Sequence, residues 1–93
     1  MIKSFKDGVT ESIWLRHFVK NFPAALHAMA RRRLGFLADA VDLADLRIPP
    51  GNRLEALKGN RAGQFSIRIN DQWRVCFRWI DGNAFDVGIT DYH

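Results

Sequence analysis

The sequence is poor in cysteine and histidine and contains no long apolar run. Its single cysteine, Cys76, excludes an intramolecular disulfide and suits a reducing compartment. The three histidines (His17, His27 and His93) show no metal-ligand spacing, so we expect no zinc site and no other cofactor. No apolar stretch approaches the roughly 18 residues of a membrane helix. The N-terminal residues also lack the apolar core of a signal peptide, so we expect a cytoplasmic protein.

Acidic residues are outnumbered by basic ones. The 93 residues include 14 Lys and Arg against 10 Asp and Glu, which gives a net charge of +4. Most of these cations are arginine, whose planar guanidinium suits phosphate recognition. The length favours one domain over residues 1–93 with a modest core. A basic domain of this size suits a nucleic acid, an acidic protein or no special partner, so charge alone leaves the partner open.

Alternating apolar and polar residues between 64 and 79 predict a β-hairpin. Residues 70–72 separate the two alternating runs and are typical of a turn. A register that pairs Ile67 with Val75 places Arg68 opposite Arg74 on the other face. Like charges opposite each other weaken a sheet, so a purely structural hairpin would gain by losing one of them. We therefore predict that this polar face binds an anion, most simply a nucleic-acid phosphate.

Two further strands are expected beside the hairpin, over residues 53–57 and 84–90. Matching the apolar residues of the last strand to those of the hairpin pairs Phe85 with Trp79 and leaves Arg78 opposite Asp86. These registers place the following residues on the polar face: Arg68, Arg74, Arg78, Asp86 and Tyr92.

Two helices are predicted before the sheet. Thr10 can cap the first, over about residues 11–20, and Pro23 suits the first turn of the second, which should end near Asp42. The second helix carries one apolar stripe, formed by Leu26, Met29, Ala30, Leu34, Leu37 and Val41. The expected fold class is α+β, with two N-terminal helices packed on one face of a twisted antiparallel sheet. The helices would cover the apolar face and leave the polar face open.

Two other segments are rich in cations. Arg31, Arg32 and Arg33 lie within the second predicted helix, where successive side chains point about 100° apart and cannot form one cluster. They indicate either a solvated helix face or an electrostatic anchor to RNA. Loop 58–63 contains Lys58 and Arg61 between glycines and can present backbone N–H groups to a phosphate. It lacks the Gly-Lys-Ser/Thr ending of a P-loop, which excludes that motif.

Four stretches of the chain resemble the HigB-type toxins of the RelE/ParE toxin–antitoxin superfamily. They are residues 1–5 (Met-Ile-Lys-Ser-Phe), 53–59 (Arg-Leu-Glu-Ala-Leu-Lys-Gly), 70–74 (Asn-Asp-Gln-Trp-Arg) and 91–93 (Asp-Tyr-His). Their order and spacing match along the whole chain. The resemblance implies a RelE/ParE-like fold and a metal-independent endoribonuclease that cuts messenger RNA in the ribosomal A site. It also implies a HigA-type helix-turn-helix antitoxin as the partner.

The resemblance also points to site residues. Carried over position by position, the RNA site would comprise Lys58, Arg74, Asp91, Tyr92 and His93. In the proposed reaction the 2′-hydroxyl attacks the adjacent phosphate, which requires a base, an acid and positive charge at the phosphorane. Arg74 would supply the charge with help from Lys58, and His93, oriented by Asp91, would act as acid or base. The RNA-binding set would add Arg68, Arg78, Arg61, Arg31, Arg32 and Arg33.

The chain departs from the family pattern at two positions. Well-known members have His-Pro where this chain has Glu55-Ala56, and many have Asp in place of Asn60. Glu55 therefore either replaces an imidazole as the alternate base or has no catalytic role. Two other functions stay open: a ParE-like gyrase inhibitor, and an RNA-binding homologue that no longer cuts.

Overall fold

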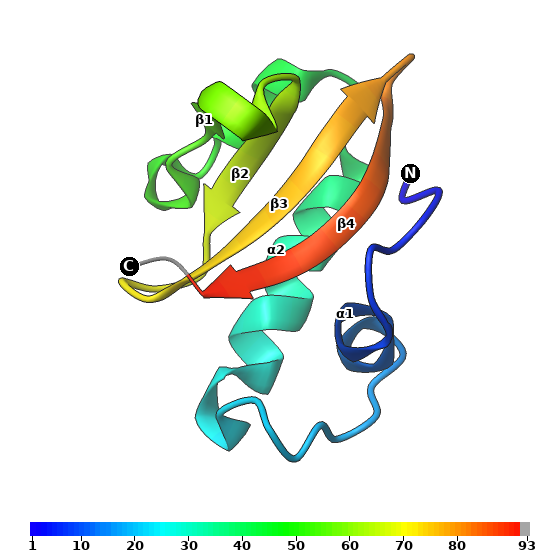
Figure 1. The fold of residues 1–93 in the computed structure, drawn as a ribbon, viewed down its shortest axis with the longest axis vertical. Helices are drawn as coiled ribbons and strands as arrows, with labels where there is room; N and C mark the ends of the chain where they lie inside the picture. Colours follow the sequence, from blue (N-terminus) through cyan, green and yellow to red (C-terminus); the bar gives the residue numbers. More distant parts are fainter. Residues whose placement is uncertain (92–93) are drawn as a thin grey trace.

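The chain folds into a four-stranded antiparallel sheet backed by helices (Figure 1). The computed structural model describes residues 1–91. The helices are α1 (Gly8–Trp14), α2 (His27–Asp39) and four short 3₁₀ helices, η1 (Ala24–Leu26), η2 (Leu43–Arg47), η3 (Pro50–Asn52) and η4 (Gly59–Arg61). The strands are β1 (Glu55–Ala56), β2 (Gln64–Arg68), β3 (Trp73–Ile80) and β4 (Asn83–Asp91), and they lie in that order in the sheet. The predicted α+β class with an antiparallel sheet is confirmed.

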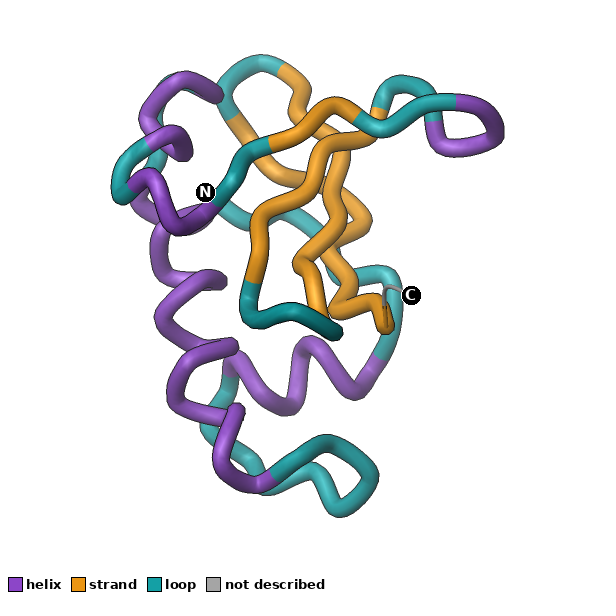
Figure 2. Tube along the Cα trace, turned by 90° about the vertical axis from the view of Figure 1, so that its left-hand side faces the viewer, coloured by secondary structure: helices purple, strands orange, loops and turns teal. Residues whose placement is uncertain are grey.

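The predicted β2–β3 hairpin forms in the predicted register. Ile67 pairs with Val75 and Arg68 with Arg74. The Ile69 N–H donates to the carbonyl oxygen of Trp73 at 2.9 Å and closes the turn. Figure 2 shows α1 and α2 on one side of the strands, so neither of these two helices crosses the opposite face of the sheet.

The core lies between α2 and the apolar face of the sheet. Three residues of the predicted stripe, Ala30, Leu34 and Leu37, are fully buried there, as predicted. The stripe was wrong at two positions, because Met29 is 40% exposed and Val41 is 73% exposed. α2 ends at Asp39 rather than near residue 42, so Val41 leaves the helical period before it can reach the core.

The first helix begins earlier and ends earlier than predicted. Its cap is Asp7, whose Oδ1 accepts a hydrogen bond from the Thr10 N–H at 2.8 Å. The helix ends at Trp14, and Arg16 has a left-handed φ of 67°. Thr10 is fully buried, and its Oγ1 accepts a hydrogen bond from the Ile89 N–H at 2.9 Å. The side chain predicted to cap α1 therefore ties this helix to β4 instead.

A β-bulge in β4 changes the predicted β3–β4 register. Trp79 pairs with Ala84, and Arg78 pairs with Phe85. The prediction that Phe85 faces Trp79 and Arg78 faces Asp86 was wrong. β4 contains one residue more than β3 across this stretch, and Asp86 there has φ 51°. Cross-strand partners share a face, so Phe85 lies on the polar face beside Arg78.

The N-terminal segment runs along the outer edge of β4 (Figure 1). It makes two isolated parallel bridges, Ile2 with Ala84 and Phe5 with Val87. These single bridges shield an otherwise open sheet edge. The predicted strand at 53–57 is short, since only Glu55–Ala56 pair with β2. Within residues 1–91, no helix has the length and apolar character needed to cross a membrane.

Replacing Thr10 by valine tests the link between α1 and β4. The variant keeps the shape of the side chain but removes the acceptor for the partly buried Ile89 N–H, so the free energy of unfolding should fall by about 1 kcal/mol. Urea denaturation measures this change. The reverse substitution at the exposed neighbour, Val9→Thr, should change stability by less than about 0.5 kcal/mol. Equal effects of the two variants would contradict a structural role for the Thr10 hydroxyl.

Candidate functional site

Arg74 lies in the polar face of the sheet, on the side away from α2. Its side chain is largely buried, with 8% of the residue exposed. Nε donates to Ser66 Oγ at 2.8 Å, and Nη2 donates to the Arg53 carbonyl oxygen at 2.7 Å. These two acceptors are uncharged and orient the guanidinium, and the Glu55 carboxylate, 3.9 Å from Nη2, is a charged partner. The result is a positively charged group fixed in one orientation.

Glu55 lies beside this guanidinium. It pairs with Ser66 in the β1–β2 register, and its Oε2 is 3.9 Å from Arg74 Nη2. The Glu55 side chain is 55% exposed, against 9% for that of Arg74. The structure therefore brings together two of the predicted site residues, a buried cation and an accessible carboxylate. A reacting group bound here would have both a potential base and a stabilising charge within reach.

Two further contributors to this arrangement escaped the sequence-based prediction. Ser66 lies on the same face of β2 as Arg68, but the sequence-based prediction gave it no role. Arg53 contributes its backbone carbonyl rather than its side chain, and it does so from a left-handed conformation with φ 46° at the end of η3. The available signal for Ser66 was its hydroxyl group, two residues before Arg68 on the same face of the strand. No side-chain pattern identifies a carbonyl.

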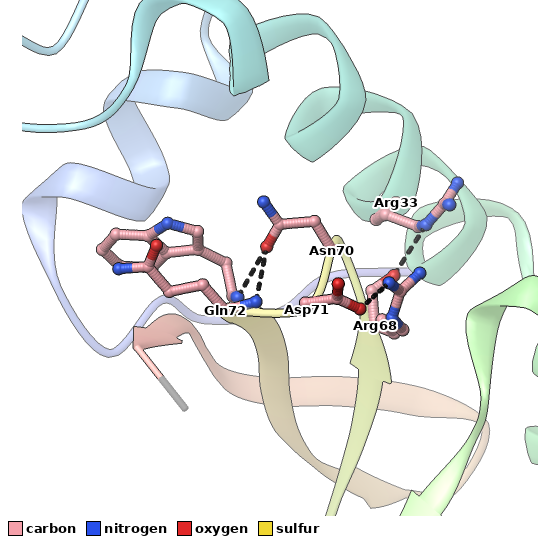
Figure 3. A network of polar contacts seen from close by, with 6 residues as sticks. Arg33, Arg68, Asn70, Asp71 and Gln72 are labelled. Carbon is pink, nitrogen blue, oxygen red and sulfur yellow. Dashed lines mark hydrogen bonds and ion pairs between the residues drawn. The ribbon is translucent and has the colours of Figure 1, made fainter. Parts of the chain in front are cut away.

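Arg68 stands opposite Arg74, yet the two guanidinium groups have different partners. Arg68 Nη2 forms an ion pair with Asp71 Oδ1 in the hairpin turn (Figure 3). The Arg68 carbonyl accepts a hydrogen bond from Arg33 Nε at 2.8 Å. The predicted repulsion across the hairpin is thus offset locally, because each arginine has a carboxylate within 4 Å.

The hairpin turn is stiffened by Asn70. Its Oδ1 accepts from the backbone N–H groups of Gln72 at 2.9 Å and Trp73 at 2.8 Å (Figure 3). Gln72 Nε2 in turn donates to Asp91 Oδ2 at 3.2 Å. Asp91 pairs with Trp73, so its side chain starts on the face opposite to that of Arg74. Tyr92 and His93, the other two residues of the predicted tail, lie outside the described residues.

The remaining predicted cations of the loop and sheet lie at separate positions. Lys58 is exposed directly before η4. Arg61 Nη2 lies 3.5 Å from Gln64 Oε1. Arg78 is on the polar face, where its Nε is 3.5 Å from Asp86 Oδ2. Both side chains of this pair are about half exposed, so the pair contributes little to stability. The predicted Arg78–Asp86 pair therefore forms, although the bulge changes the register that brings it about.

The three consecutive arginines do not share one direction, although Arg32 and Arg33 both lie 5.8 Å from the centre of the Phe36 ring. Arg31 and Arg32 line a hollow of about 570 Å³ between α1 and α2, together with Trp14 and Arg16. Arg33 points instead to the hairpin turn. Partial burial, helped by the charges of Arg32 and Arg68, lowers the pKa of Arg33 below its usual range. The structure therefore does not bring Arg31 and Arg32 to the face that holds Arg74.

No group of three or more His, Cys, Asp and Glu side chains within residues 1–91 could hold a metal ion. The chemistry available on the described part of this face is that of a guanidinium, a carboxylate and a hydroxyl.

Comparison with known proteins identifies the family. Residues 3–93 match the model of the HigB-like toxins, described as the RelE-like toxin of the type II toxin–antitoxin system HigB. The chain is 40% identical over 92 residues to Toxin HigB-1 of Vibrio cholerae, with 92% of each chain covered. It is 31% identical over 93 residues to Endoribonuclease HigB of Proteus vulgaris, with both chains covered completely.

A solved structure shares the fold. The YoeB–YefM complex from Staphylococcus aureus contains a chain that matches with a TM-score of 0.61 at 17% identity, covering 100% of this chain and 98% of that one. At such low identity the likeness supports the fold alone. The family model and the two relatives go further: this chain belongs to the HigB-like toxins, the RelE-like toxins of type II toxin–antitoxin systems.

Proposed function

We propose that this toxin is an endoribonuclease that cuts messenger RNA on the ribosome and so stops translation. The relative from Proteus vulgaris carries the name endoribonuclease, which supports the reaction class. The observation that carries the proposal is the oriented guanidinium of Arg74, with Glu55 at 3.9 Å, on the sheet face opposite α1 and α2. Such a face can accept an extended single strand.

Arg74 would stabilise the charge that develops during cleavage. When the 2′-hydroxyl attacks the adjacent phosphate, negative charge grows on the phosphorane oxygens, and a planar guanidinium can contact two of them. The hydrogen bonds to Ser66 and to the Arg53 carbonyl hold this group in place before the substrate arrives. Little reorganisation is then needed in the transition state. The reaction uses no metal in this proposal.

Glu55 would take the proton from the 2′-hydroxyl. It lies beside Arg74 and is accessible from solvent, as a base acting on a bound nucleotide must be. His93 would donate a proton to the leaving oxygen, and Tyr92 would stack on a base; both assignments rest on the sequence. Asp91 would orient His93, and Lys58 would add charge from the loop before η4.

The substrate strand would follow the sheet face. Arg61, Arg68 and Arg78 are the cations there that can contact its phosphates. Arg31 and Arg32 lie on the helical side, and Arg33 at the hairpin turn, so these three would anchor RNA outside the cleavage site.

The toxin would act in the cytoplasm with two macromolecular partners. One is the ribosome, whose A site would present the codon. The other is an antitoxin, the expected partner of a type II toxin, and we propose a HigA-type helix-turn-helix protein.

Co-expression with a HigA-type protein should allow growth of cells that the toxin alone arrests.

Substituting Arg74 by lysine should lower the cleavage rate by about 100-fold or more. Lysine keeps the charge but loses the planar fork that contacts two phosphate oxygens. Primer extension on transcripts from induced cells, with single-turnover cleavage on programmed ribosomes, measures the effect. Thermal unfolding shows whether the variant still folds, and Arg47→Lys, at an exposed site in η2, is the matched control. Intact transcripts together with broken DNA would instead indicate a gyrase inhibitor.

Replacing Glu55 by glutamine should reduce kcat by about 100-fold with little change in KM, because the amide keeps the shape of the side chain but cannot accept the proton. Glu11→Gln, at the only other glutamate, lies on the exposed side of α1 and should leave both parameters unchanged. If the variant cuts at the wild-type rate, the base lies elsewhere, and His93 becomes the candidate.

A further inference from the structure

A second cationic hollow lies on the polar face of the sheet, away from Arg74. Its volume is about 200 Å³, and it is lined by Lys6, Gln64, Arg78 and Asp86. These residues come from the N-terminal segment, β2, β3 and β4, so only the folded chain assembles them.

Lys6 reaches this face because β4 has a glycine at position 88. A Cβ placed on Gly88 would lie 3.2 Å from Lys6 Cβ and 3.4 Å from its Cδ, closer than side chains normally pack. The Lys6 backbone is fixed as well, since its N–H donates to the Val87 carbonyl oxygen at 2.9 Å. The stem of Lys6 therefore crosses the strand where a larger residue would block it.

The charges in the hollow are unequal. Two cations, Lys6 and Arg78, face one carboxylate, Asp86, whose Oδ2 is 3.5 Å from Arg78 Nε. Within residues 1–91, Lys6 forms no ion pair within 4 Å. Asp86 is the bulged residue with φ 51°, a conformation that Asn tolerates as well as Asp. The two cations therefore give the hollow a net positive charge, and the carboxylate of Asp86 makes that charge smaller.

The hollow shares its face with Arg74 and with an aromatic ring. Arg78 is four residues from Arg74 along β3, about 13 Å at the usual strand rise, and the two have the same parity. Phe85, turned to this face by the bulge, is the cross-strand partner of Arg78. A cationic hollow beside an aromatic ring suits a nucleotide better than a free anion, because a base can stack on the ring.

We propose that this hollow is a second nucleotide-binding subsite, in which Lys6 and Arg78 hold a backbone phosphate of the RNA and Asp86 limits its affinity. The subsite rests on the proposed function: the bound phosphate belongs to the strand that is cut at Arg74, at least one nucleotide further along. Its role is to position the substrate, and it takes no part in the chemical step.

Three variants test the subsite in cleavage assays on programmed ribosomes. Lys6→Gln and Arg78→Gln should each raise KM about three- to fivefold with kcat unchanged, the size expected for one solvent-accessible charged contact. Each should also reduce the slope of log KM against log salt by about one, because one phosphate contact is lost. Asp86→Asn should lower KM by a similar factor. Lys20→Gln, at an exposed lysine between α1 and η1, is the matched control.

Binding of a fluorescent single-stranded RNA to the same proteins separates this inference from the proposed function. If the wild type does not cut RNA but Lys6→Gln and Arg78→Gln weaken binding and Asp86→Asn strengthens it, the subsite stands and the nuclease proposal falls. If the wild type cuts RNA while both cation variants behave like Lys20→Gln, the subsite is wrong. Weaker binding by Asp86→Asn would show that the carboxylate supports the site rather than limiting it.

Discussion

The arrangement of the polar face depends on how one buried charge is satisfied. Burying a guanidinium is costly unless its N–H groups find acceptors, and Arg74 finds Ser66 Oγ and the Arg53 carbonyl. Ser66 comes from β2 and Arg53 from the end of η3, so this requirement ties the connector before β1 to the middle of the sheet. The two acceptors are neutral. The two hydrogen bonds therefore fix the position of the guanidinium, and the carboxylate of Glu55 lies 3.9 Å from it.

The edge strand β4 decides what else this face presents. The bulge at Asp86 shifts the pairing by one residue, which turns Phe85 away from the core and onto the polar face. Gly88 leaves room for Lys6, so the N-terminal segment contributes a cation to a face otherwise built from strands. Both features come from one edge of the sheet. Because a bulge or a small residue disrupts packing least at an edge, this is where a surface can be altered without loss of the core.

Basic residues occupy two separate surfaces of this toxin. One is the sheet face around Arg74 and Arg78, and the other is the hollow between α1 and α2 that contains Arg31 and Arg32. Arg33 lies between the two regions. It belongs to α2, and its side chain extends to the hairpin, where Nε donates to the Arg68 carbonyl oxygen. A molecule with two basic faces can contact RNA or an acidic partner on one side while the other side stays accessible.

The sequence by itself determined the α+β class, the β2–β3 register and the central part of the α2 stripe. These features follow from local periodicity, because a two-residue alternation of apolar and polar residues, or an apolar helical stripe, indicates which face is buried. The same parity placed Arg74 on the polar face and Arg78 close to Asp86. The tertiary structure decided the rest. Thr10 does not cap α1 because the helix begins earlier with Asp7 as its cap, and the Thr10 hydroxyl binds the N–H of Ile89, far along the chain, instead. Phe85 lies on the other face because of a bulge that no local pattern records. The position of the Arg74 guanidinium depends on the backbone carbonyl of Arg53, and the position of Lys6 depends on the absence of a Cβ at Gly88. Neither feature produces a side-chain pattern that can be recognised in a sequence.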